Sequence, residues 1–165
     1  MKNIKKVTIV FYSIILIGIL WIPSNLIVNA EEIIVPGYHE YTETEDEKID
    51  HWYGIARGTY LKDGTCGIKN AGTGKVSVSG TTTAHKVCDK IRVAIYLDES
   101  SDGGKSFGQI GSYYFSEDNT TSCHGSKTNI SVTSGWHYMA RGGHGAIKGS
   151  VSETTATHTG VLKAS

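Results

Sequence analysis

The stretch Gly-Lys-Ser-Phe-Gly at residues 104–108 matches the G-x-S-x-G pattern of a catalytic serine. That pattern works where a strained turn between a strand and a helix exposes the serine to histidine and aspartate partners. Here a polar, glycine-rich stretch precedes Ser106 and an extended pattern follows it, so we predict no catalytic role for this serine. The same residues do not make a phosphate-binding loop, because Glu99 stands where its first glycine is needed.

Four residues have the spacing of a calcium-binding loop: Asp98, Ser100, Asp102 and Gly103. In an EF-hand such residues offer oxygen ligands before a sharp turn. The twelfth position holds Gln109 instead of a bidentate glutamate, and no helical pattern flanks the segment. A polar hairpin loop is the simpler interpretation, and we predict that folding needs no calcium.

The chain has seven histidines and three cysteines, which are the residue types that bind zinc. It contains neither Cys-x-x-Cys nor His-Glu-x-x-His, and Cys123 and His124 are adjacent, which places them badly for sharing one ion. We therefore predict no metal ion and no cofactor.

A polar cluster near the C-terminus is the remaining candidate for catalysis. On an extended strand His137 and Arg141 point to the same side, with His144 and Glu153 near the following turn. A site near Arg141, His144 and Glu153 would suit a small secreted enzyme or toxin. An exposed face of an antiparallel sheet gives the same pattern, and we therefore predict no catalytic residues and no enzyme activity.

Aromatic residues favour binding over catalysis: Tyr113, Tyr114, Trp136 and Tyr138 fall on predicted strands. Alternation turns one of the neighbours Tyr113 and Tyr114 away from the core, where its ring can stack on a sugar or anchor a protein. Our leading hypothesis is a binding module for a surface glycan or a protein partner. A self-associating surface protein is a further alternative, favoured if a flat strand edge is exposed.

The elements that would position these residues are all strands. Polar and apolar residues alternate over 75–79 and 90–97, the pattern of half-buried strands. Further strands are predicted at 53–61, 107–115, 127–133, 136–141 and 154–162, with glycine-containing turns at 63–64, 72–74, 102–104, 134–135 and 148–150. The prediction is an all-β fold: a single antiparallel β-sandwich or partly closed barrel of about seven or eight strands. On the strand 136–141, Trp136 and Tyr138 are expected to face the core.

Residues 1–30 have the features of a cleaved signal peptide. Three lysines precede an apolar run, Pro23-Ser24-Asn25 interrupts it, and Val28-Asn29-Ala30 forms a cleavage site. An uncleaved anchor is the alternative, because the apolar run can be extended to Val28. We predict a secreted, extracellular protein with no membrane contact after cleavage. Residues 31–51 are acidic and predict a flexible leader, followed by one β domain over 52–165.

The charge of the mature chain argues against nucleic acid as a partner. All 16 acidic residues follow residue 30, whereas three of the 16 basic residues precede it, so the mature chain is acidic by three charges. A phosphate-binding protein needs a basic patch instead.

Export would bring three cysteines, Cys66, Cys88 and Cys123, into an oxidising compartment, where one must stay unpaired. Three single pairings are open. Cys66 with Cys88 is the favoured one, because Cys123 lies in a polar stretch, 116–126, that predicts a loop.

Two groups of strand-like motifs resemble a known family. The run from Ser134 to His144, with Ser152-Glu153-Thr154 and 157–160, resembles the closing strands of a family of small secreted proteins of Gram-positive bacteria. Residues 88–91 and 95–98 are similar to its middle strands. The resemblance implies export and a β domain. The family is of unknown function, so it implies no catalytic residue.

Overall fold

Strands account for all the regular structure in residues 31–55 and 60–165, the part of the chain that the computed structural model describes. They are β1 (Glu31–Ile34), β2 (Gly37–Glu43), β3 (Glu47–Gly54), β4 (Leu61–Asn70), β5 (Lys75–Ser100), β6 (Gly108–Ser131), β7 (His137–Lys148), β8 (Val151–His158) and β9 (Leu162–Lys163). The predicted all-β class is confirmed. None of these residues belongs to a helix long and apolar enough to cross a membrane.

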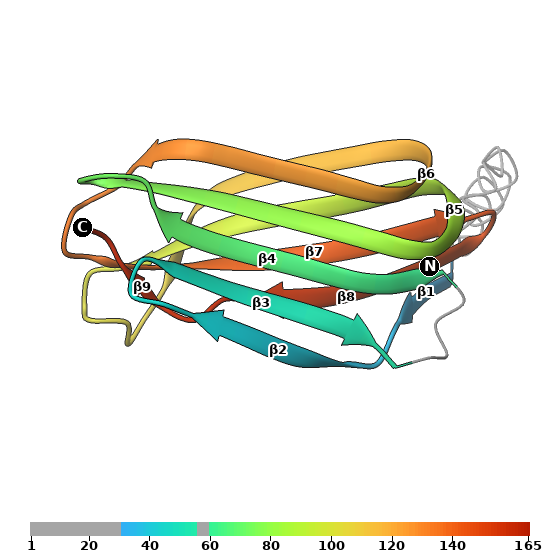
Figure 1. The fold of residues 1–165 in the computed structure, drawn as a ribbon, viewed down its shortest axis with the longest axis horizontal. Helices are drawn as coiled ribbons and strands as arrows, with labels where there is room; N and C mark the ends of the chain where they lie inside the picture. The colour runs from blue at the N-terminus through green and yellow to red at the C-terminus, as the bar shows by residue number, and fades with distance from the viewer. Residues whose placement is uncertain (1–30, 56–59) are drawn as a thin grey trace, which may run out of the picture.

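The strands form one sheet, in the order β1-β8-β7-β5-β4-β3-β2, with β6 beside β5 and β9 beside β7. The β1–β8 pair is parallel and the other pairs are antiparallel. The β5–β6 hairpin curls over at one end of the molecule (Figure 1), where the pairing register shifts between Thr83 and Cys88. The sheet is therefore folded onto itself.

Two layers result from this curl. In the first layer, residues 76–84 of β5 pair with β4, beside β3 and β2. In the second layer, residues 90–100 of β5 pair with β7, beside β8 and β1. Strand β6 follows β5 through both layers and lies at the edge of each.

The core lies between the two layers and follows the predicted alternation. Ile91, Val93, Ile95 and Leu97 of β5 are buried, and the residues between them point outward or are half-buried. The layers approach closely, because a Cβ atom added to Gly80 would lie 2.9 Å from Cγ2 of Val93. Such a distance is shorter than van der Waals contact, so glycine at this position lets the layers meet.

Strand β7 presents the inner face that its sequence predicts. Tyr138 and Ala140 are buried, and Trp136, just before the strand, is half-buried against the core. The hydroxyl of Tyr138 donates to the carbonyl of Thr133 at 3.3 Å and accepts from the Thr133 amide at 2.9 Å. A buried tyrosine needs such partners for its polar end.

Residues 31–51, predicted to be a flexible leader outside a 52–165 domain, instead form β1, β2 and part of β3. The acidic composition misleads because β2 is an edge strand whose side chains are almost all exposed. A strand in that position needs few aliphatic residues. The predicted signal peptide, residues 1–30, lies outside the described residues.

Two further expectations about the cysteines differ from the structure. Residues 116–126 are not a loop but the middle of β6, paired with β5. The favoured Cys66–Cys88 disulfide is absent, and all three cysteines are free, buried thiols. Cys66 lies in β4 and pairs with Gly80 of β5. Cys88 lies in β5 beyond Ala84, the last residue of that strand that pairs with β4, so the two cysteines occupy different parts of the sheet.

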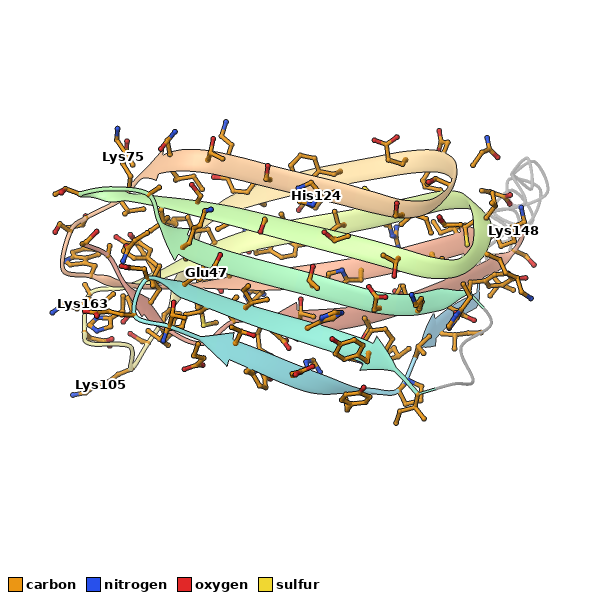
Figure 2. All side chains as sticks on the ribbon, viewed as in Figure 1. Glu47, Lys75, Lys105, His124, Lys148 and Lys163 are labelled. Atoms are coloured by element: carbon orange, nitrogen blue, oxygen red, sulfur yellow. The ribbon has the colours of Figure 1, made fainter. Side chains whose placement is uncertain are left out.

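Four lysine side chains lie toward the ends of the elongated molecule. Figure 2 places Lys75, Lys105 and Lys163 toward one end and Lys148 toward the other. Lys148 is held there by Asp89, with 2.5 Å between Nζ and Oδ1. These four lysines therefore leave the middle of the sheet faces to other residues.

Candidate functional site

The structure separates the three residues of the predicted polar cluster. Arg141 lies on the outer face of the second layer and His144 on its inner face. Glu153 is buried, and its Oε2 accepts hydrogen bonds from the backbone amides of Tyr60 at 2.9 Å and Leu61 at 2.7 Å. The two residues of β7 point to opposite faces, so no site near Arg141, His144 and Glu153 is formed.

His144 is a neutral part of the core. The Thr82 hydroxyl donates to the carbonyl of Arg92, so Nδ1 of His144 donates to Thr82 at 2.8 Å and Nε2 accepts from the hydroxyl of Thr157 at 2.8 Å. Burial lowers the pKa of His144 to about 4. Its proton-accepting nitrogen is therefore not available to a substrate.

The oxygens of the calcium-like loop are bonded within the loop. Asp102 accepts from the hydroxyls of Ser100 and Ser106, both at 2.6 Å, and from the amides of Lys105 and Ser106, both at 3.0 Å. These bonds, led by the one from Ser100, lower the pKa of Asp102. The hydroxyl of Ser106 is thus directed at a carboxylate in a turn and not at a histidine.

Asp98, the first residue of that spacing, belongs to an ion pair. Its carboxylate is buried and receives Nε of Arg141 at 2.5 Å and a second guanidinium nitrogen at 3.0 Å. Arg141 also donates to Gln109 at 3.2 Å. Over residues 31–55 and 60–165, no group of three histidine, cysteine or acidic side chains is placed to hold a metal ion.

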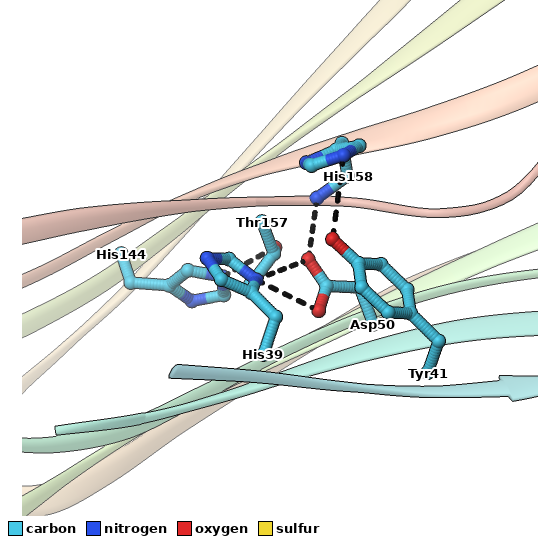
Figure 3. Close-up of polar contacts among 6 residues, drawn as sticks. All are labelled: His39, Tyr41, Asp50, His144, Thr157 and His158. Atoms are coloured by element: carbon cyan, nitrogen blue, oxygen red, sulfur yellow. Dashed lines mark hydrogen bonds and ion pairs between the residues drawn. The ribbon is translucent and has the colours of Figure 1, made fainter. Parts of the chain in front are cut away.

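A polar cluster does form, but between residues that the sequence did not single out. The carboxylate of Asp50 on β3 is fully buried, and both its oxygens lie 2.9 Å from Nδ1 of His39 on β2. The backbone amide of His158 on β8 donates to the same carboxylate at 2.8 Å. Figure 3 shows these contacts bridging the edges of the two layers.

Rings surround this bridge on its solvent side. The hydroxyl of Tyr41 lies 3.4 Å from Nε2 of His158, and the two ring centroids are 5.8 Å apart. The Tyr41 ring also stacks on His39, with centroids 6.0 Å apart. An aspartate can orient a histidine that acts as a general base. Here, however, the hydrogen bonds of Asp50 to His39 and to the His158 amide join the open edges of the two layers.

These residues were missed because their partners are distant in sequence. His39, Tyr41 and Asp50 lie in the stretch taken for a leader, and the cluster is completed by His158. The available signal was the alternation in β2, which puts His39 and Tyr41 on one face.

On the outer face of the second layer, rings and a cation form a continuous row. The rings of Tyr114 and Tyr96 meet edge to face, with centroids 6.0 Å apart, and the Arg141 guanidinium lies 5.3 Å from the centroid of Tyr96. Arg141 pairs in register with His158, which contacts Tyr41. We call these five residues the ring strip. It crosses β6, β5, β7 and β8 and reaches β2.

A groove of about 490 Å³ lies beside the ring strip. Its floor is the neighbouring row of the sheet, in which Ala94, Gly143 and Ala156 are paired across three strands. Other residues lining it include Glu32, Ile34, Arg92, Tyr96, Tyr114 and Thr154. Tyr114 is 69% exposed, and it is the one of the two neighbouring tyrosines, 113 and 114, that faces outward most.

A second groove, of about 420 Å³, lies on the outer face of the first layer. His51 and Tyr53 line it, with ring centroids only 3.8 Å apart, and the Tyr38 ring stacks with Tyr53, with centroids 5.2 Å apart. The rings in this stack cover each other's faces. Burial, followed by the charge and hydrogen bond of Glu40, raises the pKa of Tyr53.

The comparisons with known proteins give a family. A model described as a family of unknown function, DUF6147, matches residues 27–162. The chain belongs to this family. Neither a curated protein nor a solved structure matches it. DUF6147 membership confirms that the chain belongs to a family of unknown function, and the activity has to be argued from the surface of the molecule.

Proposed function

We propose that this DUF6147 protein is an exported binding module that holds an extended glycan along the ring strip. The observation that carries the proposal is the row of Tyr114, Tyr96, Arg141, His158 and Tyr41, in which ring contacts and the strand register of Arg141 with His158 link neighbours. Support for export comes from the signal-peptide pattern of residues 1–30.

The ring strip has the chemistry and the length that a sugar chain requires. Tyrosine offers a flat apolar face together with a hydroxyl at its tip, which suits a ligand whose surface is apolar on the ring faces and polar at the edges. The three steps from β6 to β8 span roughly 15 Å at ordinary strand spacing. Several consecutive sugar rings fit along that distance.

The ring strip is better suited than the groove of the first layer. There the ring of Tyr53 stacks on both Tyr38 and His51, so its faces are already occupied by neighbouring rings. Tyr114 instead meets its neighbour at 86° and is 69% exposed, so its ring is largely open to solvent. A rigid, pre-positioned ring costs little conformational entropy when a ligand binds.

Binding to a panel of soluble neutral and acidic polysaccharides, measured by affinity electrophoresis of the mature chain, tests the proposal. We expect retardation by at least one polysaccharide, weakened roughly tenfold or more in Tyr114→Ala. Tyr38→Ala is the matched control, an exposed tyrosine on the other layer, and is expected to bind normally. The proposal is wrong if no polysaccharide retards the protein, or if Tyr38→Ala is the variant that loses binding.

Strand β6 favours one other candidate function, self-association. Among the described strands it pairs only with β5, so one edge of residues 108–131 has no strand partner. An edge of that length is a template for pairing with a second copy. Sedimentation over a hundredfold range of concentration distinguishes the two candidates, because a glycan-binding monomer keeps one sedimentation coefficient throughout.

A further inference from the structure

The groove beside the ring strip contains a cation whose charge is not neutralised. Arg92 of β5 lines the groove and makes no ion pair within residues 31–55 and 60–165. Arg141, the second guanidinium that the described residues place on this face, is already bound by Asp98 through two hydrogen bonds. Glu32 lines the groove as well, but no ion pair joins it to Arg92.

Glycine at position 145 lets Arg92 lie across the sheet. A Cβ atom added to Gly145 would come within 2.6 Å of Nε and 2.9 Å of Cγ of Arg92. The arginine side chain therefore lies over the backbone of β7 while remaining exposed to solvent. Its planar guanidinium is held at the groove with its hydrogen-bond donors unused by any acid.

Glycine at position 143 keeps the groove open without serving the fold. Its φ is not in the left-handed region, and an added Cβ would meet only Cβ of Ala94 at 3.7 Å, an ordinary contact. Neither backbone conformation nor packing requires glycine here, in contrast to Gly80 and Gly145. The missing side chain leaves space directly above the floor of the groove.

We infer that the groove receives an acidic sugar unit of the bound glycan, with its carboxylate on Arg92. This inference rests on the proposed function, because the rest of the chain would lie along the ring strip. A guanidinium binds a carboxylate through two parallel hydrogen bonds, and such charge-assisted bonds are about twice as strong as neutral ones. The apolar floor of Ala94 and Ala156 accommodates the face of the sugar ring.

The experiment compares an oligogalacturonide with its methyl ester, by calorimetric titration of the mature chain. The two probes share ring and linkage, and they differ in carrying either a charged carboxylate or a neutral methyl ester. We expect the wild-type protein to bind the acid at least tenfold more tightly than the ester. Arg92→Gln and Gly143→Val should each remove most of that preference, the first by deleting the cation and the second by filling the groove.

Two controls make the outcomes distinct. Lys127→Gln removes an exposed cation on β6 away from the groove and should keep the acid preference. Unchanged thermal midpoints show that each variant is folded. Equal binding of acid and ester by the wild-type protein, or a preference that survives Arg92→Gln or Gly143→Val, overturns the inference. If in that case Tyr114→Ala still weakens both probes, the proposed function stands; if Tyr114→Ala weakens neither, the proposed function itself fails.

Discussion

Two buried polar side chains, His144 and Asp50, are satisfied by neighbours that come from other strands. His144 connects hydroxyls of Thr82 on β5 and Thr157 on β8, and Asp50 connects His39 with the amide of His158. A buried group of this kind would cost stability if it lost its partner. These residues therefore hold the layers in register, although their types alone suggested chemistry.

The lowered pKa of His144 predicts a loss of stability in acid. In the unfolded chain the imidazole takes up a proton below about pH 6.5, whereas in the folded protein it stays neutral down to about pH 4. Stability is complete above the unfolded pKa and falls as the pH drops toward 4. We expect the free energy of unfolding to decrease by about 2 kcal/mol from pH 7 to pH 5 through this residue.

Urea titrations at the two pH values measure this effect. His144→Gln should flatten the dependence, and His85→Gln, a change at an exposed histidine, should leave it as in the wild type. Equal slopes for the wild type and His144→Gln would contradict the assignment of His144 as the neutral core histidine.

The three thiols give a second residue-scale prediction. Burial raises the pKa of Cys66 to about 12 and also raises that of Cys88 and Cys123. The thiolate is the reactive form of cysteine, so we expect the native protein to react slowly with a thiol reagent. The denatured protein should react quickly at all three thiols, consuming three equivalents of the reagent. A denatured protein that shows one equivalent without reductant would mean that a disulfide forms after all.

At the scale of elements, β7 connects the core with the proposed site. Its inner face supplies Tyr138 and Ala140 to the core, and its outer face supplies Arg141 and Gly143 to the ring strip and the groove. The two-residue period of a strand makes this division possible. Core packing and the proposed binding face thus depend on alternate residues of one segment.

Substitutions on the two faces of β7 should separate these roles. Tyr138→Ala removes a fully buried ring and its bonds to Thr133, and we expect a loss of about 3–5 kcal/mol in the free energy of unfolding. Met139→Ala, on the half-exposed outer face, should cost less than about 1 kcal/mol. Guanidinium midpoints measure both, and a larger cost for Met139→Ala would reverse the two faces.

Sequence alternation predicted where strands lie better than where they end. It found the segments 75–79 and 90–97 but not that both belong to β5, because the polar residues at the curl break the pattern. Strand β6 was misjudged in a similar way. Its polar middle, 116–126, has the composition of a loop, but pairing with β5 keeps it extended. Pairing partners, not local propensity, decide the structure of such stretches.

Only part of the candidate site was visible in the sequence. Tyr114 was one of two neighbours expected to point outward, and Arg141 was expected on the outer face of its strand. The contribution of β2 was not expected, because Tyr41 contacts His158, a residue 117 positions away in the sequence. Nothing in the local pattern of an acidic edge strand indicates which strand of the other layer will lie beside it.

At the scale of the whole molecule, the two layers carry different outer surfaces. The first layer bears the stacked rings around Tyr53, and the second bears the ring strip with its groove. The curled β5–β6 hairpin joins the layers at one end (Figure 1), and Asp50 bridges their free edges. The scaffold can therefore present a preformed binding face whose position depends on no loop.

Binding of a glycan along the ring strip is tested most directly by mapping the binding face in solution. Backbone amide resonances of the mature chain would be followed while the best-retained oligosaccharide of the panel is added. We predict the largest shifts at 94–96, 114, 141–143 and 156–158, the rows of the ring strip and its groove, with little change elsewhere. Shifts concentrated instead around Tyr53, on the outer face of the first layer, would contradict binding along the ring strip.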